Sequence, residues 1–168
     1  MLIWDSANIG SQIDSYKQVP AFENGFHFHH SQGKHYADDG YYYGQKWQCV
    51  EYIKRFYRLA KSHEMPNIWG HARDFFDAHL ADNTLNPARG LIQFNNHGPM
   101  CPARDDILVF HDSQYGHVGI VTSVSDSQVE IIQQNIFGKP RQIFSLEYNN
   151  NAYSILQPRV AVGWMRKA

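Results

Sequence analysis

Hydrophobic residues follow two different spacings along this chain of 168 residues. From Gln48 to Ser62 they recur every three or four positions, which is the period of an amphipathic helix. The apolar positions of this stretch are Val50, Ile53, Phe56, Tyr57 and Ala60. From Asp105 onward the apolar residues alternate with polar ones, as in half-buried strands. Helices first and strands later predict an α+β domain with an antiparallel sheet.

Further elements follow from local signals. A second helix is predicted over residues 68–80, with Asn67 as its N-cap directly after Pro66. Residues 1–40 are polar and interrupted by proline and glycine, so we expect loops there. Strands are predicted at residues 107–110, 117–124, 128–135 and 159–165. Because no repeat or linker interrupts the pattern, we expect a single domain over residues 1–168.

The composition restricts the class of protein. The 14% aromatic and 18% charged residues are typical of a globular chain, and the net charge of −1 argues against nucleic acid or an anionic membrane as partner. No apolar run approaches the roughly 20 residues that cross a bilayer, and the first residues lack the pattern of a signal peptide. Two cysteines are too few for a disulfide framework, so we expect a reduced, cytoplasmic protein, with export by a route without a cleaved signal as the alternative.

Cys49 begins the predicted helix and directly follows Gln48. Backbone N–H groups at a helix N-terminus carry partial positive charge, which favours the thiolate, the nucleophilic form of cysteine. The backbone N–H of Cys49 and the side-chain amide of Gln48 are suitable donors to an oxyanion. Cys49 shares the apolar stripe of Ile53 and Phe56, so its sulfur should point toward packed structure.

The predicted hairpin supplies a histidine. If its turn is centred on Asp126, His117 and Asn135 lie at equal separations from the centre and face each other. Gln133 then lies two residues away on the same face, because side chains alternate along a strand. A shift of one residue would present residues 132 and 134 instead, so this geometry leaves the register open.

These residues suit a cysteine hydrolase. Such enzymes need a thiolate, a histidine that pairs with it and protonates the leaving amine, and a third group that orients the imidazole. The candidates are Cys49, His117 and either Gln133 or Asn135. On spacing alone this arrangement is no more than suggestive, because a cysteine that begins a helix usually has a structural role.

Four segments around the candidates resemble the CHAP family, the cysteine- and histidine-dependent amidohydrolases and peptidases. They are residues 44–52, 102–110, 116–122 and 132–135, and residues 163–165 resemble the closing strand of the family. The sequences of these segments are most similar to the amidase domain of glutathionylspermidine synthetase/amidase and of trypanothione synthetase. This resemblance implies a papain-like fold in which N-terminal helices pack on an antiparallel β-sheet.

The resemblance also implies roles for individual residues. Cys49 becomes the nucleophile and His117 the general base and acid. Gln133 stands where the family usually has glutamate; a neutral amide can orient an imidazole but cannot stabilise imidazolium by charge. The amidase relatives carry an arginine five residues after the cysteine, where this chain has Lys54 followed by Arg55. Lys54 and Arg55 are candidate substrate contacts, although lysine does not reproduce bidentate binding of a carboxylate. Tyr43, which we expect beside the active-site groove, is a third candidate.

The function implied is hydrolysis of a peptide-type amide through an acyl-enzyme on Cys49. Two substrate classes stay open: a glutathione–polyamine conjugate, or the stem peptide of peptidoglycan, as for a lysin or toxin. A third alternative, motivated by Gln133, is a CHAP-like module that binds an amide ligand with weak catalysis. No cofactor is expected.

A metal is not expected either. Four histidines, His27, His29, His30 and His35, lie close together in the sequence. They lack cysteine or carboxylate companions at metal-ligand spacing, so surface histidines in a loop explain them better.

Overall fold

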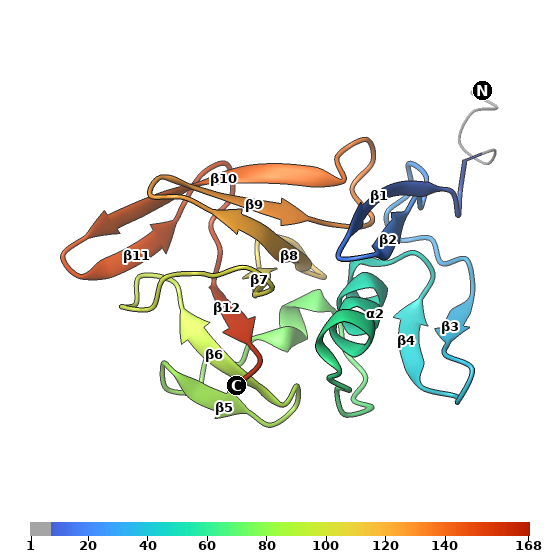
Figure 1. Cartoon of the computed structure of the whole chain (residues 1–168), viewed down its shortest axis with the longest axis horizontal. Coiled ribbons are helices and arrows are strands. Elements are labelled where there is room, and N and C mark those ends of the chain that lie inside the picture. The colour runs from blue at the N-terminus through green and yellow to red at the C-terminus, as the bar shows by residue number, and fades with distance from the viewer. Residues whose placement is uncertain (1–7) are drawn as a thin grey trace. The chain divides into compact units, whose positions relative to one another are not determined.

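The computed structural model describes residues 8–168, and strands dominate them (Figure 1). One α-helix, α2, spans Cys49–Lys61, and a short 3₁₀ helix, η1, spans Ala72–Phe75 in the described part of the chain. The strands are β1 (Gln12–Tyr16), β2 (Val19–Phe22), β3 (Lys34–Tyr36), β4 (Tyr42–Gln45), β5 (Thr84–Asn86), β6 (Leu91–Asn95), β7 (Ile107–Phe110), β8 (His117–Val124), β9 (Gln128–Ile132), β10 (Arg141–Asn149), β11 (Ala152–Ile155) and β12 (Gly163–Arg166).

The chain divides into two compact units. One consists of the residues up to Glu64 together with Ile132–Arg141, and the other of Met65–Ile131 and Gln142–Ala168. The first unit contains helix α2 and two antiparallel hairpins, β1–β2 and β3–β4. The second contains a sheet with the strand order β11-β10-β9-β8-β7-β12-β6-β5. The mixed α+β class is therefore confirmed.

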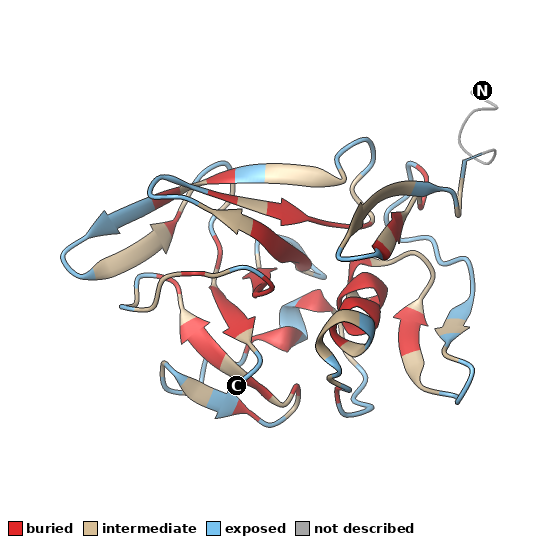
Figure 2. Ribbon diagram, viewed as in Figure 1, coloured by how far each residue is buried: buried red, intermediate tan, exposed pale blue. Residues whose placement is uncertain are grey.

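Helix α2 forms where the hydrophobic period predicts it. Its apolar face is buried, and its backbone ends at Ser62, which takes a left-handed conformation and donates its N–H to the Tyr57 carbonyl. Glu51 lies in the first turn and Lys61 in the last, as the helix dipole favours. The polar side of the helix is also buried along its first half, because strands β2 and β4 pack against α2 (Figure 2).

The core of the second unit lies on the sheet. Phe110, Val121, Ile131 and Trp164 are fully or almost fully buried there, together with further apolar residues of the same cluster. Strand β12 lies antiparallel between β7 and β6. Strand β7 in turn pairs with β8, so that β8 occupies an interior position of the sheet and is buried on both faces over most of its length.

The structure corrects the prediction of N-terminal helices. No helix covers residues 68–80; only the single turn η1 forms there. Ile68 and Trp69, at the start of this segment, are exposed, and Trp69 is 86% exposed. Gly70 and the buried pair Phe75 and Phe76 instead belong to an irregular segment around η1.

Strands were missed elsewhere. The expected N-terminal loops contain β1, β2 and β3, and the expectation for residues 1–7 lies outside the described residues. Strand β9 ends at Ile132 and β12 begins at Gly163, so both are shorter than predicted. Predicted strands 107–110 and 117–124 are confirmed with the same boundaries.

Candidate active site

Cys49 is the first residue of helix α2 and is 8% exposed. The preceding residue, Gln48, is the N-cap and has an extended backbone, with φ −73° and ψ 160°. The N–H groups of the first helical turn have no partner inside the helix and carry the positive end of its dipole. The structure therefore confirms both the helix start at the cysteine and the burial of its side chain.

The side chain of Gln48 is engaged by neighbouring residues. Its Nε2 donates to the carbonyls of Phe28 at 3.1 Å and His30 at 2.8 Å. Its Oε1 accepts a hydrogen bond from Nδ2 of Asn135 at 3.1 Å. Both amide protons of Gln48 are used in these bonds, so donation to an oxyanion would require one of them to break. The backbone N–H of Cys49 is the simpler donor.

The two candidate orienting amides belong to the same unit as Cys49. Asn135 has a positive φ of 69°, and its Oδ1 accepts from Nδ2 of Asn24 at 2.7 Å. Gln133 is fully buried and donates from Nε2 to the carbonyl of Lys139 at 2.9 Å. Each amide thus already has a partner within its own unit, and neither is favoured over the other as the group that orients His117.

A buried polar network surrounds Glu51 in the first turn of α2. Glu51 is completely buried and accepts hydrogen bonds from His35 at 2.8 Å, from Arg55 at 2.5 Å and from Gln134 at 2.7 Å. Burial of the Glu51 carboxyl acts to raise its pKa, but the hydrogen bonds from His35 and Arg55 outweigh burial and leave the pKa lowered. Glu51 is therefore held ionised inside the unit.

Sequence reasoning missed most of this network. Arg55 was predicted only as a substrate contact and His35 only as a surface histidine, and no role in the site was predicted for Glu51. The available signal was a carboxylate and a guanidinium one turn apart on a helix that begins with a candidate nucleophile. Burial of these two groups depends on strands β2, β3 and β4, which were not predicted.

The three predicted substrate contacts are buried. Arg55 donates to Glu51, to the Pro20 carbonyl and to Gln134. The Lys54 ammonium lies over the rings of Tyr41 and Tyr42, at 5.1 and 5.4 Å from their centroids. Tyr43 contacts the ring of His35, with 5.1 Å between the centroids. These side chains have packing roles in this structure, and substrate binding by them stays a prediction.

His117 begins strand β8 in the other unit. Its register partner on β7 is Phe110, and the two rings are nearly parallel with centroids 6.2 Å apart. Gly116 precedes it with φ +69°, and a Cβ there would lie 2.6 Å from the Phe110 carbonyl oxygen and 2.7 Å from the Arg73 nitrogen. The start of β8 therefore requires glycine next to the candidate base.

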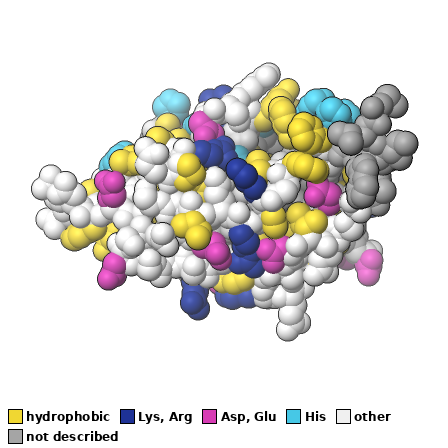
Figure 3. Space-filling model, turned by 90° about the horizontal axis from the view of Figure 1, so that it is seen from above, with side chains coloured by type: hydrophobic (Ala, Val, Ile, Leu, Met, Phe, Trp, Pro, Cys, Tyr) yellow, Lys and Arg dark blue, Asp and Glu magenta, His cyan; other side chains and the backbone are white. Residues whose placement is uncertain are grey.

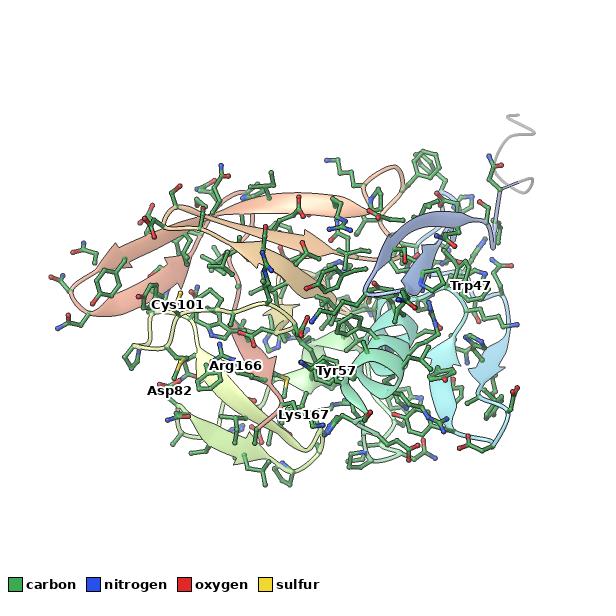
Figure 4. All side chains as sticks on the ribbon, in the orientation of Figure 1. Trp47, Tyr57, Asp82, Cys101, Arg166 and Lys167 are labelled. Carbon is green, nitrogen blue, oxygen red and sulfur yellow. The ribbon has the colours of Figure 1, made fainter. Side chains whose placement is uncertain are left out.

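Two ion pairs hold the segments that flank β7. Arg159 donates to both carboxylate oxygens of Asp112, and this pairing is the main cause of the lowered pKa of Asp112; the charge of His117 contributes in the same direction. The buried Asp106 accepts two hydrogen bonds of 2.8 Å from Arg166 and one from the Ala103 N–H. Arg166 also donates to the Cys101 carbonyl, and both residues are labelled in Figure 4.

The hairpin around Asp126 agrees in part with prediction. Thr122 on β8 and Glu130 on β9 meet through a hydrogen bond of 2.7 Å between their side chains, as a turn centred on Asp126 requires. Val129 and Ile131 are buried, as expected. Strand β9 stops before Gln133, however, so the predicted ladder pairing of His117 with Asn135 lies beyond the strand.

The histidine-rich loop has no metal-binding geometry. The rings of His27, His29 and His30 lie 4.7 to 5.9 Å apart, while His35 binds Glu51. Across residues 8–168, no three histidine, cysteine or acidic side chains are arranged to hold a metal ion.

Within the same residues no helix is long and apolar enough to cross a membrane. On the face seen in Figure 3, acidic and basic side chains are interspersed.

Comparison with known proteins identifies relatives. Residues 39–135 match the model of the CHAP domain. The chain is 26% identical to trypanothione synthetase from Crithidia fasciculata over 161 residues, which cover 88% of this chain and 24% of that protein. It is 32% identical to bifunctional glutathionylspermidine synthetase/amidase from Escherichia coli over 112 residues, covering 62% of this chain and 17% of the relative. The chain thus spans about a quarter or less of the length of these relatives.

Proposed function

The chain belongs to the CHAP family, and from that membership we propose that it hydrolyses amide bonds with Cys49 as the nucleophile. The observation that carries the proposal is the position of Cys49 as the first residue of α2, inside the matched region. A helix N-terminus stabilises the thiolate and presents backbone N–H groups to an anion. No cofactor takes part in this reaction.

The proposed reaction has two halves. The Cys49 thiolate attacks the carbonyl carbon, the C–O π electrons move to oxygen, and the backbone N–H of Cys49 stabilises the oxyanion. Collapse of this intermediate breaks the C–N bond, and protonated His117 gives its proton to the leaving amine. His117 then takes a proton from water as the water attacks the thioester. The carboxylic acid leaves and the thiolate is restored.

Gln133 or Asn135 would orient His117 in this scheme. A neutral amide fixes the imidazole but stabilises the imidazolium less than glutamate does. We therefore expect a slow enzyme relative to family members that carry glutamate at that position. A CHAP-like module that binds an amide without turnover is the limiting case.

The substrate we propose is a glutathione–polyamine conjugate. The support comes from the E. coli relative, which is named as a glutathionylspermidine amidase, and from its 32% identity over 112 residues. Peptidoglycan stem peptide is the alternative, drawn from the resemblance to the CHAP family. The net charge of −1 favours neither a polyanion nor a polycation as partner.

The test is a pair of incubations with matched enzymes. Wild-type protein and Cys49→Ala are each incubated with glutathionylspermidine and, separately, with purified peptidoglycan. Release of spermidine by the wild type alone supports the proposal, and release of soluble peptide by the wild type alone supports the peptidoglycan alternative. Turnover of neither, with measurable binding of either, indicates a binding module.

A further inference from the structure

We propose that Gln134 is a positioning residue of the amidase site, which holds the peptide unit between Gln48 and Cys49 so that the Cys49 N–H points at the oxyanion. This inference rests on the proposed function, because the orientation of the Cys49 N–H matters only if an oxyanion forms during acyl transfer to Cys49. Gln134 belongs to the same unit as Cys49 and is 1% exposed.

The amide of Gln134 joins three segments of that unit. Its Nε2 donates to the Gln48 carbonyl at 2.9 Å and to Glu51 Oε2 at 2.7 Å. Its Oε1 accepts from the Phe22 N–H at 2.8 Å and from Arg55 at 3.4 Å. Both amide protons and both lone pairs are therefore used, and the rotamer of Gln134 is fixed from both ends.

The carbonyl of Gln48 and the N–H of Cys49 belong to one planar peptide unit. In a trans peptide these two groups point in opposite directions, so a hydrogen bond that fixes the carbonyl also fixes the N–H. The helix itself holds this carbonyl weakly, because the bond from the Tyr52 N–H is 3.4 Å long. The bond from Gln134 is shorter by half an ångström and is the stronger constraint on the plane.

The donor is in turn held by charge. Glu51 is ionised, buried and paired with Arg55, and it accepts the second proton of the Gln134 amide. Hydrogen bonds to ionised groups are shorter and stronger than neutral ones. Glu51 and Arg55 thus act on the Gln48–Cys49 peptide through Gln134, and Gln134 itself is not expected to touch the substrate. This arrangement explains why a charged pair is buried beside a helix N-terminus that needs an accurately aimed N–H.

The experiment compares two reactions of the same sulfur. Alkylation of Cys49 by iodoacetamide displaces iodide and forms no oxyanion, whereas acetylation by p-nitrophenyl acetate passes through one. Gln134→Met keeps the side-chain volume and removes the donor. We expect its acetylation rate constant to fall about 10- to 100-fold, since removing a whole oxyanion donor costs about 10²–10³ in rate. The alkylation rate constant should stay within about twofold.

Gln93→Met is the matched control. Gln93 is equally buried and bonds through its amide to the Asp77 backbone and to Asn86, in the other unit. It should lose stability as Gln134→Met does, with an unchanged ratio of acetylation to alkylation. If Gln134→Met folds poorly, Gln134→Glu keeps the acceptor oxygens and removes the amide protons, and the same fall in the ratio is expected.

The outcomes separate the two claims. If wild-type Cys49 is not acetylated, as shown by peptide mass mapping, the proposed function fails and this inference fails with it. If the wild type is acetylated but the ratio is unchanged in Gln134→Met and Gln134→Glu, Gln134 is only structural and the inference alone is overturned. A fall in the ratio in both variants, absent from Gln93→Met, supports the positioning role.

Discussion

Arg55 donates hydrogen bonds to both carboxylate oxygens of Glu51, one turn earlier on α2, and the two residues are 4% and 0% exposed. Removal of one partner of a buried ion pair leaves an uncompensated charge. We predict that Arg55→Met lowers the free energy of unfolding by about 3–5 kcal/mol, measured by urea titration. Arg58→Met is the control: Arg58 pairs with Asp39 and Glu64 near the surface, so its loss should matter much less. Equal effects would contradict a structural role for Arg55.

Glu51 also predicts a dependence of stability on pH. Its pKa is lowered in the folded protein, so the unfolded chain takes up its proton first as the pH falls. The stabilisation is fully present above the unfolded pKa of about 4.3 and is lost as the pH falls through the lower folded value. Urea midpoints between pH 6 and pH 3 should fall more steeply for the wild type than for Glu51→Gln. Parallel curves would show that another carboxylate dominates acid unfolding.

Gly116 and Gly138 provide a matched test of the segment before His117. Both have φ +69°, but a Cβ at Gly116 would collide with Phe110 and Arg73, whereas none of the described atoms lies within 4 Å of one at Gly138. Gly138→Ala should cost only the strain of a left-handed residue, about 1–2 kcal/mol. Gly116→Ala should cost more and also reduce amidase activity, because β8 can no longer begin correctly at His117. Similar stability and activity for the two variants would contradict this assignment.

Elements with a strong period were predictable from the sequence. Helix α2 and strands β7 and β8 follow continuous apolar patterns, and their observed boundaries match the predicted ones to within a residue. The prediction of a helix at residues 68–80 was wrong. Ile68 and Trp69 are exposed, so the apolar residues of this segment do not form one buried helical face. The short strands β1 to β4 carry few apolar residues and are stabilised by pairing and by contact with α2, which local patterns do not reveal.

The helix start at Cys49 was predictable from the sequence, and the surroundings of the candidate site were not. Cys49 was identified from its place at a helix start, which the structure confirms. The roles of Gln48 and Arg55 depend on carbonyls of Phe28, His30 and Pro20, which come from segments distant in sequence. Any residue type can supply a backbone carbonyl, so the hydrogen bonds of Gln48 and Arg55 could not be predicted from the sequence.

Gln133→Glu tests whether Gln133 is the neutral third residue of the proposed catalytic group, beside Cys49 and His117. We predict a higher kcat, because a carboxylate stabilises the imidazolium of His117 where an amide does not. Loss of the hydrogen bond to the Lys139 carbonyl should lower stability by about 1–3 kcal/mol. An unchanged or lower kcat in a folded variant would indicate that Asn135 orients His117, and Asn135→Ala would then show the larger loss of activity.

The central claim is that Cys49 is the nucleophile, and the chain contains its own reference thiol. Cys101 is the other cysteine, and partial burial raises the pKa of its thiol. After brief treatment with iodoacetamide near neutral pH, peptide mapping gives the modified fraction of each cysteine alongside the residual amidase activity. We predict that Cys49 is modified much faster than Cys101 and that activity falls in proportion to modified Cys49. Full activity with Cys49 alkylated, or a Cys49 that reacts no faster than Cys101, would contradict the account.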